Sequence, residues 1–128
     1  MQVLEEWVAS GEAEKISAAA SLVSEAPNNF VVSHSYFCIN LLRKSHSIGT
    51  ECHQSVKSDL FSSAISGARS GIAGQPMPHD LALKNNASEV AAQLAVGSPE
   101  RDFYESLVEY ATSEIEDLLA KNEELFER

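Results

Sequence analysis

Apolar side chains recur every three or four positions through most of the chain, which is the spacing of one face of an α-helix. The first such segment covers residues 4–8 and stops at Gly11, because glycine readily adopts the left-handed turn that ends many helices. The second segment covers residues 12–25, is rich in alanine, and is closed by Pro27. The pattern therefore predicts an N-terminal pair of helices.

The segment from residue 30 to residue 47 fits two interpretations. Its apolar side chains return at helical spacing, but Val31, Val32 and Ile39 are also typical of a β-strand. A single strand would leave its backbone groups without hydrogen bonds, and the chain offers no second strand to pair with it. We therefore predict a helix for this segment.

Breakers and capping residues divide the rest of the chain into three more helices. A regular apolar stripe covers residues 52–66. Asp80 is a capping residue that precedes a helix ending at Gly97. Ser98 supplies a hydroxyl cap and Pro99 a suitable first residue for the last helix, whose apolar spacing continues to the end of the chain.

The fold class that follows is all-α, with about six helices arranged in three helical hairpins. The hairpins turn near Gly11, Gly49 and Gly97. A chain of 128 residues with 44% hydrophobic content is large enough to close one core. We therefore predict a single all-helical domain over residues 1–128, with a long Gly/Pro loop at residues 66–79.

In the first helical pair, Leu4 and Trp7 precede Gly11, and residues 13–27 combine small residues with a closing proline. This pair resembles the repeats of HEAT and armadillo proteins, in which the second repeat helix has such a pattern. The resemblance covers about residues 1–60. It implies a HEAT-like α-solenoid that binds other proteins along a groove, with no catalytic residues to carry over. An orthogonal helical bundle is the other architecture that the helices allow.

The charge of the chain is strongly negative and unevenly distributed. The chain contains nine Lys and Arg residues and nineteen Asp and Glu residues, which gives a net charge of -10. Residues 99–128 hold ten of these acids and three of the bases, whereas residues 28–98 are close to neutral. Such a surface repels phosphate backbones and anionic lipid headgroups, so we expect neither nucleic acid nor a membrane as partner.

The cysteine content and the apolar runs indicate a location. Two cysteines are too few for a disulfide framework, and the N-terminal residues lack the pattern of a secretory signal. No apolar stretch approaches the roughly 20 residues that cross a bilayer. We therefore expect a soluble, cytoplasmic protein.

Histidines and cysteines gather in one part of the chain, but their spacing does not indicate a metal site. The residues are His34, Cys38, His46, Cys52 and His53. Their spacing fits no compact zinc finger, and adjacent residues on a helix point about 100° apart, so Cys52 and His53 do not readily share one ion. We expect buried cysteines that act as small apolar residues, and no metal or cofactor.

The glycine-rich loop is the segment most suited to a small ligand. Arg69, Ser66 and Ser70, with backbone N–H groups freed by three glycines, are able to receive a phosphate or a carboxylate. His79 and Asp80 lie at the end of the same loop. The loop is not a Walker motif, because no Gly-Lys-Ser or Gly-Lys-Thr follows. The favoured interpretation is a surface loop that packs on its neighbours.

Four large aromatic side chains are expected in the core, namely Trp7, Tyr36, Tyr104 and Tyr110. The alternative is that they anchor an interface, because desolvated aromatic residues dominate binding energy. The sequence favours the core, where such side chains are more commonly found.

The last helix offers a second candidate surface. Its apolar stripe continues to the end of the chain through Ile115, Leu118, Leu119, Leu125 and Phe126. Such a stripe is a candidate interface, and two copies packed antiparallel are a possible homodimer. The same helix carries a stripe of acids, interpreted as a solvated face, at Glu105, Glu109, Glu116 and Glu123.

These observations predict a non-catalytic protein–protein interaction or scaffold domain with an acidic helical surface. A basic protein partner is expected on grounds of charge complementarity, and no sequence signature of the usual catalytic classes is present. The alternative is a small-anion or ligand-binding domain, or an enzyme, organised around the loop from Ser66 to Asp80. A deep pocket at that loop favours the alternative, and a grooved surface favours the interaction domain.

Overall fold

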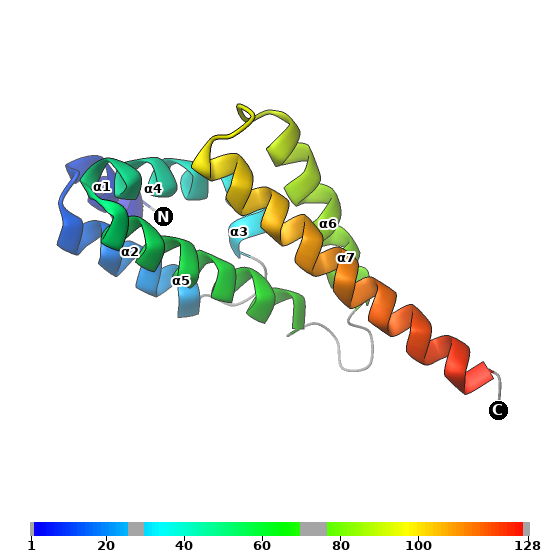
Figure 1. Ribbon diagram of the computed structural model, residues 1–128. Helices are drawn as coiled ribbons and strands as arrows, with labels where there is room; N and C mark the ends of the chain where they lie inside the picture. The colour runs from blue at the N-terminus through cyan, green and yellow to red at the C-terminus, as the bar shows by residue number, and fades with distance from the viewer. Residues whose placement is uncertain (1, 26–29, 70–76, 127–128) are drawn as a thin grey trace. The chain divides into compact units, whose positions relative to one another are not determined.

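The chain is all-α, as predicted. The computed structural model describes residues 2–25, 30–69 and 77–126, and these residues contain no strand (Figure 1). The helices are α1 Gln2–Ser10, α2 Ala13–Glu25, α3 Phe30–Ser33, α4 Ser35–Ile48, α5 Thr50–Arg69, α6 Met77–Ala92 and α7 Pro99–Phe126. The helical interpretation of residues 30–47 is therefore confirmed.

The helices form two compact units, residues 1–67 and residues 68–128. In the first unit α1, α2 and α4 pack on one another, and α5 contacts α2 and α4 through side-chain contacts. The second unit consists mainly of α6 and α7, which pack as an antiparallel pair (Figure 1). The single domain expected from the sequence stays a prediction.

The core of the first unit follows the apolar pattern of the sequence. Each of its longer helices buries one apolar stripe, because residues three and four apart share a face. The fully buried side chains include Val8, Ile16, Val23, Leu41, Leu42, Val56 and Leu60. Burial of such aliphatic side chains stabilises the fold by roughly 1.5–3 kcal/mol each.

The predicted helix over residues 30–47 is interrupted at His34. The backbone of His34 has φ -125° and ψ 48°, which lies outside the helical region, so α3 ends before it and α4 begins after it. The His34 ring stacks on Phe30, with ring centroids 4.3 Å apart. Phe37 and Cys38 then point into the core, as the helical interpretation requires.

Two predicted glycine turns have the expected backbone. Gly11 follows α1 with φ +70°, and Gly97 precedes α7 with φ +83°. Both values lie in the left-handed region, which side chains with a Cβ rarely adopt. Space is open around both positions, so backbone conformation rather than crowding favours glycine there.

The predicted cap of the last helix is also confirmed. The backbone N–H of Arg101 donates to Ser98 Oγ at 3.2 Å, and Ser98 Oγ donates to the Ala95 carbonyl at 2.8 Å. The hydroxyl thus satisfies one of the donors that a helix start leaves unpaired, and it also ties α7 to the preceding turn.

Replacing Ser98 by alanine will lower the free energy of unfolding by about 1 kcal/mol, because the Arg101 N–H then loses its acceptor. Urea unfolding followed by circular dichroism measures the change. Ser106→Ala is the matched control, because its hydroxyl donates to the Asp102 carbonyl on the exposed surface inside α7. An equal loss in both variants would contradict a capping role for Ser98.

The start of α6 differs from the prediction. Asp80 does not cap this helix: α6 begins at Met77, and Asp80 is a buried residue within its first turns, 3% exposed. Proline is tolerated in a first turn because its missing N–H has no helical partner there, so Pro78 does not prevent the earlier start. The helix ends at Ala92, and a turn leads on to Gly97.

The predicted long loop is shorter than its limits of 66–79. Residues 66–69 belong to α5 and residues 77–79 belong to α6. Glycine within a helix lowers helix stability by about 1 kcal/mol, so the residues around Gly67 stabilise the helix by more than this amount. Residues 70–76 lie outside the described residues.

None of the helices, within the ranges given above, has both the length and the apolar content of a membrane span.

Candidate functional site

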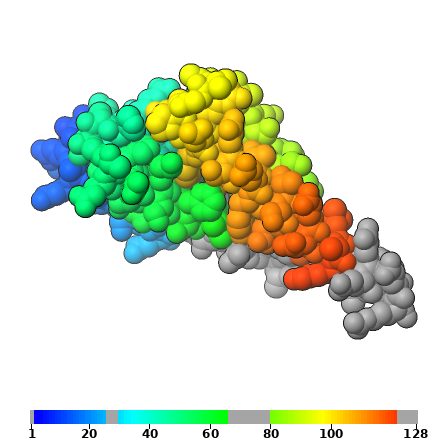
Figure 2. Space-filling model, viewed as in Figure 1, coloured from blue at the N-terminus to red at the C-terminus, as the bar shows by residue number. Residues whose placement is uncertain are grey.

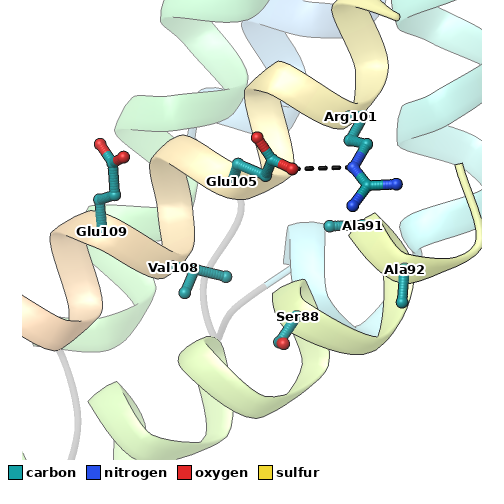
Figure 3. Close-up of a pocket in the computed structure, with 7 residues that line it drawn as sticks. All are labelled: Ser88, Ala91, Ala92, Arg101, Glu105, Val108 and Glu109. Atoms are coloured by element: carbon teal, nitrogen blue, oxygen red, sulfur yellow. Dashed lines mark hydrogen bonds and ion pairs between the residues drawn. The ribbon is translucent and has the colours of Figure 1, made fainter. Parts of the chain in front are cut away.

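A groove lies between α6 and α7, within the second unit (Figure 3). Its volume is about 360 Å³, near the lower end of the range of ligand pockets. The groove is open along one side rather than enclosed, which suits a side chain or a helix better than a buried small molecule. Its lining consists of Ser88, Ala91, Ala92, Arg101, Glu105, Val108 and Glu109.

The two helices contribute different chemistry to this groove. The α6 side presents Ser88, Ala91 and Ala92, whose small side chains leave the space open. On α7, Val108 points toward α6, whereas the carboxylate of Glu109 points away from it (Figure 3). The result is a floor of small and apolar groups beneath a charged rim.

One end of the groove is closed by Arg101. Its Nε donates to Glu105 Oε1 at 2.8 Å, and its Nη1 donates to the Leu94 carbonyl at 3.0 Å. The second bond satisfies a carbonyl in the turn after α6. Arg101 is therefore engaged in holding the hairpin together, and its charge is offset by Glu105. An exposed ion pair of this kind contributes about 0–1 kcal/mol.

The acidic stripe on α7 is exposed, as predicted for its described members. Glu105, Glu109 and Glu116 are all exposed, and spacings of four and seven residues keep them along one face. Glu109 and Glu116 form no ion pair with any residue whose side chain the structure describes. This face of α7 is left with uncompensated negative charge. The side chain of Glu123 lies outside the described residues.

Of the residues predicted to line a ligand-binding loop, the structure describes the side chain of Asp80 alone. Asp80 is buried in α6. The backbones of Ser66 and Arg69 belong to α5 and that of His79 belongs to α6, but their side chains are not described. Ser70 lies outside the described residues. The proposed anion site therefore stays a prediction.

The apolar stripe predicted for the last helix is partly uncovered. Leu119 is 49% exposed, and Ile115 and Leu118 are half-buried. On the same helix Leu107 and Ala111 are fully buried, so the cover of α7 decreases toward its C-terminal end. The side chains of Leu125 and Phe126 lie outside the described residues.

The polar groups of α4 and α5 make internal contacts. Ser45 Oγ donates to the Leu42 carbonyl at 2.8 Å, so its 3.0 Å contact with Nδ1 of His53 has the histidine as donor. Cys52 Sγ instead lies 3.9 Å from Ser17 Oγ on α2. The adjacent Cys52 and His53 thus point to different partners, as expected for neighbours on a helix.

The two cysteines differ in burial. Cys38 is fully buried, and this burial raises the pKa of its thiol from 9.0 to about 12. A thiol of this kind is protonated at neutral pH and acts as an apolar side chain, as predicted. Cys52 is only partly buried, which corrects the expectation that both are core residues. In the described part of the chain, no group of three or more potential metal ligands is able to hold an ion.

Comparison with known proteins gives no match: no family model, no curated protein and no solved structure matches this chain. The resemblance of the first helical pair to HEAT and armadillo repeats therefore stays a prediction.

The groove was not predicted from the sequence, although a signal for it is present. Ser88, Ala91 and Ala92 place three small side chains on adjoining faces of one helix, directly before a hairpin turn. Small residues on a helix that packs against a second helix leave space beside the contact. Ala91 also belongs to the core, since it is 5% exposed.

Proposed function

We infer that this chain is a non-catalytic protein-binding domain that recognises a basic partner through the acidic surface of its second helical pair. The observation that carries this proposal is the uncompensated negative charge along α7. Helix α7 contains nine acidic residues and two basic ones, and one of these bases, Arg101, is paired within the helix. A basic surface meeting this face gains favourable electrostatic interactions and associates faster.

The rim charges supply specificity more than affinity. Each exposed ion pair contributes about 0.2–1 kcal/mol, and salt screens it. The groove beneath the rim adds an apolar contact of the kind that a lysine or arginine stem covers while its charged end stays in water. Together these features favour a basic protein over a small ligand.

Replacing Glu109 and Glu116 together by glutamine will weaken capture of basic proteins from a cell extract by about threefold to tenfold, because two rim charges are lost. The matched control is Glu5→Gln with Glu6→Gln, which removes the same charge from exposed positions on α1. Quantitative mass spectrometry of the captured proteins at low and high salt measures the effect.

Two outcomes would contradict the proposal. One is an equal loss in both double variants, because net charge rather than the α7 surface would then explain the capture. The other is no capture at all, together with a rise in melting temperature on addition of phosphate. That result would favour the ligand-binding alternative at the loop from Ser66 to Asp80.

A further inference from the structure

The two helices that form the groove, α6 and α7, extend beyond the residues that line it. Ser88 and Val108 line it from opposite sides. Two turns before Ser88 on α6, the same helical face carries Leu81, and two turns after Val108 on α7 it carries Ile115. Because the two helices are antiparallel, both steps go toward the same end of the pair (Figure 1). One further turn leads to the start of α6 and to Leu119 on α7.

This continuation is apolar and uncovered. Leu81 is 42% exposed and Leu119 is 49% exposed, and Ile115 between them is half-buried. Leu119 lies at the level where α6 begins, so α6 offers little cover to it. Single exposed leucines are common on surfaces, but here the register of two helices places them at one end of one groove.

The groove therefore has two chemically different ends. Its first part, near Val108, is bordered by the exposed carboxylate of Glu109 and by the Arg101–Glu105 ion pair, and its far end presents Leu81 and Leu119. From Val108 to Leu119 is eleven residues along α7, which corresponds to about 16 Å. In Figure 2 the side chains of α7 form a continuous strip on the visible face, coloured yellow to orange-red.

We propose that this groove is the docking site for a basic amphipathic helix of another protein, held by leucine-like anchors at the Leu81 and Leu119 end and by lysines or arginines at Glu109. A helix suits a straight groove of about three turns, and positions eleven apart fall on nearly the same helical face. This inference rests on the proposed function and adds the shape of the partner.

Charge distinguishes this occupant from a second copy of the chain. The apolar stripe also permits a homodimer of two antiparallel α7 helices. However, each α7 carries nine acids and two bases, so two copies of this helix share the same net negative charge, which disfavours their contact. A basic helix gains from the same charges, so the electrostatics of α7 favour it as the occupant.

The test uses a synthetic helical peptide of about 18 residues, with two leucines near one end and three lysines about eleven positions away on the same face. Fluorescence anisotropy measures its affinity for the whole chain. Leu119→Ser and Leu81→Ser are each expected to weaken binding about tenfold, and Glu109→Gln about threefold, because desolvated apolar anchors contribute more than exposed charges. Val96→Ser, at an 86% exposed position in the turn after α6, is the matched control.

A second peptide of the same composition, with the leucines moved two turns closer to the lysines, is expected to bind about tenfold more weakly. Circular dichroism of each variant confirms that its helices are retained. Unchanged affinity in both leucine variants, or equal binding of the two peptides, would overturn the inference. A chain that sediments as a dimer, and as a monomer after Leu119→Ser, would also overturn it, because a second copy would then occupy the groove.

The two proposals fail in distinguishable ways. If the leucine variants leave peptide binding unchanged while Glu109→Gln with Glu116→Gln still reduces capture of basic proteins, the docking groove is wrong and the acidic binding surface stands. If neither set of variants reduces binding, both proposals are wrong.

Discussion

Replacing Leu107 by alanine will lower the free energy of unfolding by about 2–5 kcal/mol. Leu107 is fully buried in the middle of α7, one turn after the buried side chains of Phe103 and Tyr104. The substitution removes apolar contacts and leaves a cavity that the packed neighbours only partly fill. Urea unfolding followed by helical circular dichroism measures the loss.

The matched control for this prediction is Leu119→Ala. Both substitutions remove the same atoms from the same helix, but Leu119 is 49% exposed, so we expect a loss below about 1 kcal/mol. Equal losses at the two positions would contradict the difference in burial along α7. That result would also remove the basis for an uncovered apolar end of the groove.

Helical spacing predicted the secondary structure well because periodicity acts over many residues. The apolar stripe that contains Leu41 and Leu42 forms the buried face of α4. Residues 30–47 are therefore helical rather than a strand, as their spacing predicted. The break at His34 could not be predicted in the same way. It depends on a single backbone conformation and on a ring stacked against Phe30, which are properties of the folded chain.

Helix boundaries show how local signals can mislead. Serine and aspartate are similarly preferred at the N-cap position of a helix, so Ser98 and Asp80 are equivalent start signals. Ser98 precedes a proline and caps α7, as predicted. Asp80 instead lies within α6 and is buried, since the helix begins three residues earlier at Met77. A capping residue is a good start signal only where nothing before it is able to continue the helix.

Burial of individual aromatic residues was only partly predictable. Tyr104 is 1% exposed and belongs to the core, as expected. Tyr36 is 81% exposed, so its predicted place in the core is wrong. It precedes the buried Phe37 and Cys38 on α4, and a helix that buries those two positions turns Tyr36 outward by about 100° per residue. The burial of an aromatic side chain therefore depends more on its position on the helix than on its residue type.

The candidate site was less predictable than the fold. The exposed acids of α7 follow from the sequence alone, because their spacing places them on one face away from the apolar stripe. The groove beside them does not, because it depends on the register between α6 and α7. That register brings Ser88 opposite Val108, and no periodicity within one helix specifies it.

Raising the pH above 9 will destabilise the chain through Cys38, by roughly 1 kcal/mol per pH unit until the pH approaches the raised pKa of its thiol. The ordinary pKa of a cysteine thiol is 9.0, and burial raises that of Cys38 to about 12 in the folded chain. Between these values the unfolded chain releases a proton that the folded chain retains. The contribution of the Cys38 thiol to the free energy of unfolding is therefore fully present below pH 9 and decreases as the pH rises above it.

The measurement compares unfolding of the natural chain and Cys38→Ala between pH 7 and pH 11. Because other groups also titrate in this range, the informative quantity is the difference in unfolding free energy between the two proteins. Alanine removes the thiol, so this difference should shrink above pH 9. Parallel pH profiles for the natural chain and Cys38→Ala would show that ionisation of this thiol is not coupled to folding.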